Sequence, residues 1–185
     1  MTSTLGYAIL GLLARRPRTG YDLARLMERP VGWFWTASHS QIYPELARLE
    51  RDELVEHVDV DAAGPRQSKI YSATDSGMAA LRAWVASDLV PQPVRDLEVL
   101  RLWSLWAVDP DTAKDLVQRA RAVHSQRLAA YEAERDSVVD DPDAYDPTSP
   151  TFASRVTLEG GIRSRRAAIE WLDWLTDQLA EGSPS

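Results

Sequence analysis

The chain has 185 residues, of which 44% are hydrophobic and 26% are charged, and its formal net charge is −7. This composition is typical of a globular protein and excludes an intrinsically disordered chain. Cysteine is absent, which excludes disulfides, a thiolate nucleophile and cysteine-bound zinc, and we therefore expect a cytoplasmic protein.

The N-terminal part is predicted to be helical rather than a targeting or membrane segment. Met1 to Leu13 lacks the basic start and the cleavage site of a signal peptide, and no stretch of the chain reaches the roughly 20 apolar residues of a membrane span. Apolar residues at helical spacing predict a helix over residues 4–14 and a second, short helix over 19–28. Proline and glycine then predict a turn over 30–37.

A third helix is predicted to begin between residues 38 and 40 and to end near residue 52. Its buried stripe is formed by Ile42, Leu46 and Leu49 at spacings of four and three residues. Ser38 and Gln41 have the spacing of a capping box, which would satisfy free backbone donors at the start of the helix. Pro44 favours a late start, because proline is tolerated in the first turn of a helix and not in its interior.

A β-hairpin and another helix follow. Residues 54–60 and 67–73 are rich in β-branched and aromatic residues and flank Gly64 and Pro65, which predicts two strands joined by a turn. Thr74 is expected to cap a helix that runs to about residue 87. Together these elements predict a winged helix-turn-helix domain over residues 1–88.

The C-terminal half is predicted to be a second domain, all-helical, over residues 94–181. Helices are expected over 94–107, 110–138 and 152–180, and the proline- and aspartate-rich stretch 140–151 is expected to be a loop. The predicted fold class is therefore mostly α with a small β-hairpin wing. The apolar residues of the last helix are expected to form a dimerisation stripe: Ile162, Ile169, Trp171, Leu172, Leu175 and Leu179.

The polar side chains at the start of the third helix are the candidates for reading DNA. In a helix-turn-helix the second helix of the motif enters the major groove, where Gln pairs with adenine and Arg reaches guanine or phosphate. On the hairpin, two cations suit phosphates or the minor groove. The candidates on these two elements are Ser38, His39, Ser40, Gln41, Tyr43, Arg48, Arg66 and Lys69. The alternatives are a Gln41 that only caps the helix, an Arg48 that is only a solvated charge and a wing tip that is an ordinary polar turn.

Four motifs carry a resemblance to a known family: LGYAILGLL at residues 5–13, GYDL at 20–23, SxxQIYPxLxRLE at 38–50 and KxYxxTxxG at 69–77. In these the chain closely resembles the PadR family of transcriptional regulators. The resemblance implies a homodimer that binds palindromic operators through its N-terminal domain and pairs through its C-terminal helices. It also implies recognition-helix contacts from Ser40, Gln41, Tyr43 and Arg48, and places Lys69 and Tyr71 in the wing. Members of this family are usually repressors, and several are released by phenolic acids or aromatic drugs.

The seven tryptophans are many for a chain of this length. Trp103 and Trp106, three residues apart on one predicted helix, are candidates to stack an aromatic effector. The alternative is that these rings are anchors of the core or of a dimer interface, because Trp buries a large area and is enriched in interfaces.

An enzyme is not expected. His39, His57 and His124 lie on three different predicted elements, and the chain has no metalloprotease, serine-hydrolase or phosphate-loop motif, so we expect neither a cofactor nor a metal site.

The favoured function is a sequence-specific transcriptional regulator, a repressor released by a small aromatic ligand. The alternative is a winged-helix protein-interaction module without specific DNA binding, which the acidic net charge would suit. Residues 1–90 hold 10 Lys and Arg against 11 Asp and Glu, whereas residues 91–185 hold 11 against 17, so most of the acidity lies outside the predicted DNA-binding domain.

Overall fold

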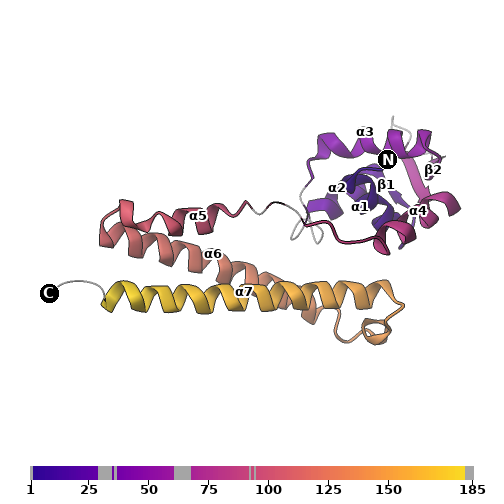
Figure 1. Ribbon diagram of the computed structural model, residues 1–185. Helices are drawn as coiled ribbons and strands as arrows, with labels where there is room; N and C mark the ends of the chain where they lie inside the picture. The colour runs from indigo at the N-terminus through magenta and orange to yellow at the C-terminus, as the bar shows by residue number, and fades with distance from the viewer. Residues whose placement is uncertain are drawn as a thin grey trace. The chain divides into compact units, whose positions relative to one another are not determined.

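The computed structural model describes residues 2–28, 35, 37–60, 68–91, 93 and 95–181, and the chain divides into two compact units, Met1–Pro91 and Gln92–Ser185 (Figure 1). The predicted class, mostly α with a small antiparallel sheet, is confirmed. Most of the turn predicted over 30–37, and the tip of the hairpin at 61–67, lie outside the described residues. None of the helices in the described part of the chain has the length and apolar character needed to cross a membrane.

The first unit contains four helices and three strands. The helices are α1 (Thr4–Leu13), α2 (Gly20–Glu28), α3 (His39–Arg51) and α4 (Asp75–Val85), and the strands are β1 (Arg18–Thr19), β2 (Val55–Val60) and β3 (Ser68–Ala73). The sheet has the order β1-β3-β2 and is antiparallel throughout. The predicted elements are all present, and β1 is an addition. Its two residues carry no pattern of their own and become a strand only by pairing with Tyr71 and Ile70 of β3.

One apolar core holds the first unit together. It is built from residues of α1, α2, α3, β2 and β3: Ile9, Leu10, Leu12, Leu13, Leu23, Ala24, Met27, Ile42, Leu46, Leu49, Val55 and Tyr71. The helix α4 is joined to α1 by a parallel stack of Tyr7 and Trp84, whose ring centroids are 4.7 Å apart. The predicted stripe of α3 thus faces the core, which turns the opposite side of that helix outwards.

The end of α3 is fixed by a turn that contains no glycine. Glu53 has a positive φ of 57°, its N–H donates to the carbonyl of Glu50, and the N–H of Leu54 donates to the carbonyl of Leu49. This pair of bonds is the Schellman motif, in which the left-handed residue is usually glycine. The turn leads directly into β2, so it sets where the hairpin begins relative to α3.

The Thr74-x-x-Gly77 motif clamps this turn onto α4. The Thr74 hydroxyl accepts from the Gly77 N–H at 3.0 Å, which caps α4 as predicted, and donates to the Glu53 carbonyl at 2.7 Å. A Cβ on Gly77 would lie 2.0 Å from the Leu54 carbonyl oxygen, so only glycine fits at this position. The motif therefore holds the junction between α3 and the hairpin against α4.

The second unit is a long helical hairpin with a short helix at its side. Its elements are α5 (Leu97–Trp103), the 3₁₀ helix η2 (Leu105–Ala107), α6 (Pro110–Asp136), the 3₁₀ helix η3 (Pro142–Tyr145) and α7 (Pro150–Glu181). Asp109 and Pro110 begin α6 as predicted, with the Asp109 carboxylate accepting from two backbone N–H groups. The single helix predicted over 94–107 is wrong at both ends. Asp96 caps α5 only at Leu97, and the chain leaves the α-helix at Ser104.

A buried histidine connects α5 to the long hairpin. His124 of α6 is buried, its Nε2 lies 2.9 and 3.0 Å from the two carboxylate oxygens of Glu98 in α5, and its Nδ1 lies 3.0 Å from a guanidinium nitrogen of Arg165 in α7. An Arg donor facing Nδ1 fits the neutral imidazole that carries its proton on Nε2 and donates it to Glu98. Each of the three helices contributes one member of this polar cluster.

The acidic stretch predicted as a loop contains a docked turn. Ala144 in η3 is fully buried, and its carbonyl accepts a 2.7 Å bond from Arg155 Nε of α7. The Arg155 guanidinium also lies over the rings of Tyr145 and Phe152, at 4.9 and 5.3 Å from their centroids. The prediction of an irregular loop over 140–151 is therefore wrong for η3, which Asp141 caps by accepting from the Asp143 N–H and which Arg155 of α7 contacts.

The dimerisation stripe predicted on the last helix requires a correction. Ile162 and Leu172 are fully buried within the single chain, and Leu172 packs against Leu102 and Val117 in the core of the second unit. A side chain with no exposed surface has none to lose to a partner, so these two residues belong to the core of their own chain. Ile169, Leu175 and Leu179 are half-buried and Trp171 is exposed.

Candidate nucleic-acid interface

The start of α3 is a hydrogen-bonded cluster of exposed polar side chains. The Gln41 side-chain carbonyl accepts from the Ser38 N–H at 2.9 Å and from the Ser38 hydroxyl at 3.0 Å. The hydroxyls of Ser38 and Ser40 are 2.9 Å apart. The predicted capping box is thus present, and it occupies the Gln41 carbonyl oxygen. The amide NH₂ of Gln41 is the part of this side chain that could meet a base edge.

The exposed side of α3 is formed by residues at helical spacing, which we call the α3 outer face: Ser40, Tyr43, Pro44, Ala47 and Arg51. On the opposite side Ile42, Leu46 and Leu49 are fully buried. Pro44 lies beyond the first turn and has no N–H to donate to the Ser40 carbonyl. A helix with one side fixed in a core and the other bare is suited to lie in a groove of another molecule.

The middle of α3 and the start of α2 form one continuous surface. Tyr43 is 53% exposed, and its ring lies against Gly20, where α2 begins. Tyr21, the next residue, is also exposed. The start of α2 is capped by Thr19, whose hydroxyl accepts from the Asp22 N–H at 3.1 Å. The exposed phenol of Tyr43 in α3 therefore lies beside the start of α2.

Arg48 lies at the flank of the α3 outer face. Its guanidinium lies 3.6 Å from the Glu45 carboxylate, and Glu45 in turn accepts a 2.6 Å hydrogen bond from the Ser3 hydroxyl at the start of α1. Arg48 is half-buried, so the structure gives it a role in joining α3 to α1 in addition to the predicted contact with DNA.

The hairpin of β2 and β3, which we call the wing, carries one of the predicted cations in the described residues. Lys69 is exposed on β3, opposite Asp59 of β2. His57 of β2 contacts the carboxylate of Glu50 through Nδ1 and lies 3.8 Å from Asp59 through Nε2, so the wing is tied to the end of α3. Arg66 and the side chain of His39 lie outside the described residues.

The prediction that Tyr71 contacts DNA from the wing requires a correction. Tyr71 is only 8% exposed, it belongs to the apolar core of the first unit, and burial raises the pKa of its phenol. The cause is the period of the strand: Lys69 and Tyr71 are two residues apart and share a face, but Tyr71 lies nearer the centre of the sheet, between β1 and His57 of β2. Tyr71 therefore supports the wing and does not face solvent.

Three residues of the α3 outer face were missed by the sequence analysis: Pro44, Ala47 and Arg51. The signal that could have found them is their spacing, because they follow Ser40 by four, seven and eleven residues along one side of a helix. Arg51 is exposed in the last turn of α3 and could reach a phosphate, while Ala47 leaves room for a base or its methyl group to approach.

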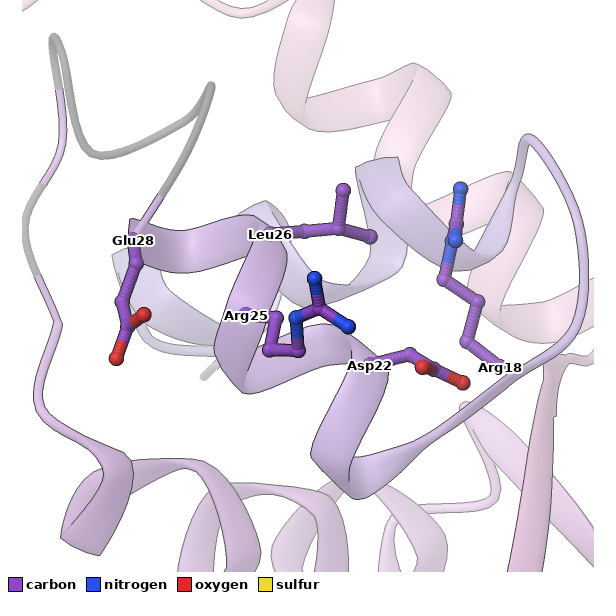
Figure 2. A pocket seen from close by; sticks show the side chains of 5 residues that line it. All are labelled: Arg18, Asp22, Arg25, Leu26 and Glu28. Atoms are coloured by element: carbon purple, nitrogen blue, oxygen red, sulfur yellow. The ribbon is translucent and has the colours of Figure 1, made fainter.

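A hollow of about 430 Å³ lies beside α2, lined by Arg18, Asp22, Arg25, Leu26 and Glu28 (Figure 2). Among the described residues the buried Nε of Arg18 has no hydrogen-bond partner, and burial lowers the pKa of this guanidinium. The walls carry two guanidinium groups and two carboxylates. This balance gives the hollow no preference for a charged ligand, and we assign it no site.

The candidate effector residues of the second unit stand on its surface. Trp103 and Trp106 are 75% and 83% exposed. A cavity of about 390 Å³ lies between α5 and α6, but neither tryptophan lines it. Among the described residues of the second unit, none covers these two rings.

A helix-turn-helix with an exposed second helix and an adjoining wing defines the class of the winged-helix transcriptional regulators. Residues 9–83 match the model of the transcriptional regulator PadR-like family, and residues 94–180 match the model described as virulence activator alpha C-term. The chain belongs to the PadR-like family of transcriptional regulators, which confirms the resemblance seen in its motifs.

Two relatives are similar over nearly the whole chain. A probable transcriptional regulator of Mycobacterium tuberculosis is 33% identical over 96% of this chain and 98% of its own length. The negative transcriptional regulator PadR of Bacillus subtilis is 27% identical over 91% of this chain and 93% of its own.

Crystal structures of Bacillus subtilis PadR share the fold. The complex with operator DNA has a TM-score of 0.85 at 26% identity, covering 96% of this chain and 99% of the other. The complex with p-coumaric acid has a TM-score of 0.79 at 26% identity, covering 95% of each chain.

Proposed function

We propose that this protein is a homodimeric repressor that binds a palindromic operator and is released by a small aromatic ligand. The observation that carries the DNA-binding part is the α3 outer face, which combines a hydroxyl, a phenol and a guanidinium on a helix whose opposite side chains Ile42, Leu46 and Leu49 are fully buried. This is the arrangement that a recognition helix needs in the major groove. The structure of a relative with operator DNA, at a TM-score of 0.85, supports the same part of the proposal.

Each DNA contact has a distinct task in this proposal. Gln41 and Ser40 read base edges from the start of α3, Tyr43 and Arg48 bind phosphates at its sides, and Lys69 with Arg66 binds the backbone from the wing. Ser38 and His39 complete the polar start of the helix. The first 90 residues are nearly neutral in charge, with 10 basic and 11 acidic side chains, so cations on one face can act against phosphates.

The dimer and the ligand complete the mechanism. Two recognition helices of a homodimer would lie about one turn of DNA apart, ~34 Å, and would read a palindrome. Repression is supported by the name of the Bacillus subtilis relative, a negative transcriptional regulator, and an aromatic ligand by the complex of that relative with p-coumaric acid. A ligand that binds one spacing of the two helices more tightly than the other would shift the population away from the DNA-bound form.

The experiment that tests the proposal is a titration of the full-length protein with a duplex from upstream of its own gene. A scrambled duplex is the control, and both are measured at two salt concentrations. Tight, salt-sensitive binding to the upstream duplex alone supports a specific regulator, because phosphate contacts release counterions. Equal or absent binding across a panel of upstream duplexes contradicts the proposal and favours a protein-interaction module.

Variants separate the tasks of the individual residues. Lys69→Ala is expected to weaken binding to every duplex and to reduce the salt slope by about one. Gln41→Ala removes both the cap acceptor and the amide donor, whereas Gln41→Glu keeps the acceptor and removes the donor. Both Gln41 variants should lose the preference at one base pair, while only the alanine should weaken α3. If both retain full sequence preference, Gln41 is a capping residue and reads no base.

The ligand is tested on the protein–duplex complex. p-Coumaric acid and related aromatic acids are added to the preformed complex, and the expected result is a loss of duplex affinity that saturates with ligand concentration. Trp103→Ala and Trp106→Ala should weaken this response if these rings stack the ligand. An unchanged affinity at millimolar ligand removes the ligand from the proposal and leaves DNA binding untouched.

A further inference from the structure

One face of the wing carries four titratable side chains and reaches the end of α3. His57 and Asp59 are two residues apart on β2, so they lie on the same face of the strand. Their register partners on β3 are Tyr71 and Lys69. The ring centroids of His57 and Tyr71 are 5.7 Å apart, and Nδ1 of His57 contacts the carboxylate of Glu50 in α3. His57 is therefore the side chain through which this face of the wing meets α3.

Both ring nitrogens of His57 face carboxylates. Nδ1 contacts Glu50, and Nε2 lies 3.8 Å from an oxygen of Asp59. A neutral imidazole has one N–H and can donate to one of these groups, whereas an imidazolium has two and can donate to both. The His57 side chain is 21% exposed, so water can supply the second proton without unfolding of the wing. The geometry therefore offers an acceptor to each nitrogen of the charged ring.

We propose that His57 is a positioning residue for DNA binding, whose protonation fastens the wing to α3 and strengthens the contact with DNA. The inference rests on the DNA binding of the proposed function and adds a dependence on pH to it. Histidine is the side chain that ordinarily changes its charge between pH 5 and 8. A charged His57 forms an ion pair on each side of the ring, where a neutral ring makes a single hydrogen bond. The proposed contacts on α3 and at Lys69 then keep a fixed spacing.

The charges around His57 change in the direction that favours DNA. With a neutral ring, Glu50 and Asp59 carry two negative charges against the one positive charge of Lys69, a balance of −1, and protonation of His57 brings this balance to 0. Burial raises the pKa of the Tyr71 phenol, so this group stays uncharged. Asp59 lies directly opposite Lys69, and side chains in such pairs interact across the two strands. An imidazolium that attracts Asp59 therefore leaves more of the Lys69 charge for a phosphate.

The test measures the dissociation constant of the full-length protein for its upstream duplex between about pH 6 and about pH 8 at one salt concentration. His57→Phe keeps a ring against Tyr71 and removes both nitrogens, and Glu50→Gln removes the charge at Nδ1. We expect the wild-type dissociation constant to rise at least threefold over this range, and each variant to lose most of that rise. The double variant should lose no more than either single variant, because the two residues act through one contact.

Glu56→Gln is the matched control. Glu56 precedes His57 on β2, so its exposed carboxylate lies on the other face of the strand. This substitution removes the same charge as Glu50→Gln but should retain the pH dependence of the wild type. His39, a proposed DNA contact, is a second histidine of the first unit. Its contribution to the pH dependence is common to all of these proteins, so it cancels in their comparison.

A second measurement needs no DNA. The coupling between His57 and Glu50 is obtained from urea unfolding of the wild type, the two single variants and the double variant at about pH 6 and about pH 8. We expect a favourable coupling at the lower pH that falls by at least half at the higher pH. A contact that does not depend on the charge of the ring would show the same coupling at both.

The outcomes separate this inference from the proposed function. Equal couplings at the two pH values overturn the inference, and so does a wild-type pH dependence that persists in His57→Phe or Glu50→Gln. A pH-dependent coupling beside a DNA affinity that does not change with pH overturns it as well, because His57 would then hold the wing without positioning a DNA contact. A wild-type chain that binds no upstream duplex specifically contradicts the proposed function instead, and the coupling alone then decides whether His57 holds the wing by its charge.

Discussion

The ring of Tyr43 lies against Gly20 so closely that a Cβ on this glycine would stand 2.6 Å from Tyr43 Cε1. Gly20 is the first residue of α2, and Tyr43 lies near the middle of the α3 outer face. The contact therefore joins the two helices of the helix-turn-helix at the surface proposed to meet DNA. The absence of a side chain at residue 20 is what allows the phenol to lie there.

Gly20→Ala is expected to change DNA binding more than stability. The added methyl must displace the Tyr43 ring, which is half exposed and can rotate, so the free energy of unfolding should change by less than about 1 kcal/mol. The phenol would leave its position beside α2, and affinity for the upstream duplex should fall several-fold. The measurement is a duplex titration beside urea unfolding. Gly11→Ala is the control, because a Cβ there meets no atom within 4 Å.

Glu53→Gly is expected to stabilise the first unit. Glu53 is exposed and holds a positive φ, a conformation that costs an L-residue about 1–2 kcal/mol and glycine much less. The greater freedom of glycine in the unfolded chain cancels part of the gain. The free energy of unfolding should therefore rise by up to about 1 kcal/mol, as measured by urea titration. A loss of stability would mean that the Glu53 side chain makes a contact worth more than the strain.

The same turn illustrates how far the sequence predicts the fold. The stripe of Ile42, Leu46 and Leu49 identifies α3, because a 3.6-residue period is a property of the local sequence. No local signal marks its last residue, since glutamate stands where a Schellman turn usually has glycine. Strand β1 has no local signal either, because its two residues become a strand only by pairing with Tyr71 and Ile70, which lie 53 and 51 positions further along the chain.

The local structure at the start of α3 was predictable from the sequence, whereas its contacts with DNA stay a prediction. The capping box of Ser38 and Gln41 follows from their spacing, and it is confirmed. Tyr71 was misplaced because the sequence of β3 gives no indication that β1 pairs with it at this end, which places Tyr71 in the core of the first unit. For Ile162 and Leu172 the error has another cause: an apolar period shows that a helix face is buried, but not whether its own chain or a second copy buries it.

Tyr71→Phe tests the burial of this residue directly. Burial raises the pKa of the Tyr71 phenol, so the folded state keeps its proton at a pH where the unfolded chain has lost it. The contribution of this group to stability is complete below about pH 10, the usual value for Tyr, and is lost as the pH rises towards the folded pKa. In Tyr71→Phe the free energy of unfolding should therefore fall less steeply as the pH rises above about 10. The variant should bind DNA like the wild type. If a stable Tyr71→Phe variant had a reduced affinity for DNA, Tyr71 would be a DNA contact after all.

The adjacent glycines of α7 give the sharpest comparison in the second unit. A Cβ on Gly160 would meet no atom within 4 Å, whereas one on Gly161 would lie 2.8 Å from the ring of Tyr131, which is buried. Gly160→Ala should stabilise the protein by about 0.5–1 kcal/mol, because glycine in a helix interior costs that amount relative to alanine.

Gly161→Ala gains the same helix propensity, but it must push a buried ring in a packed core, which typically costs 1–3 kcal/mol. We expect it to be less stable than Gly160→Ala by at least about 1 kcal/mol in urea unfolding followed by circular dichroism. All three proteins are compared at one concentration, because dimerisation makes stability concentration-dependent. Equal stabilities of the two variants would show that α7 can move away from Tyr131 and that the packing of α6 on α7 is looser than the contact of Gly161 with Tyr131 implies.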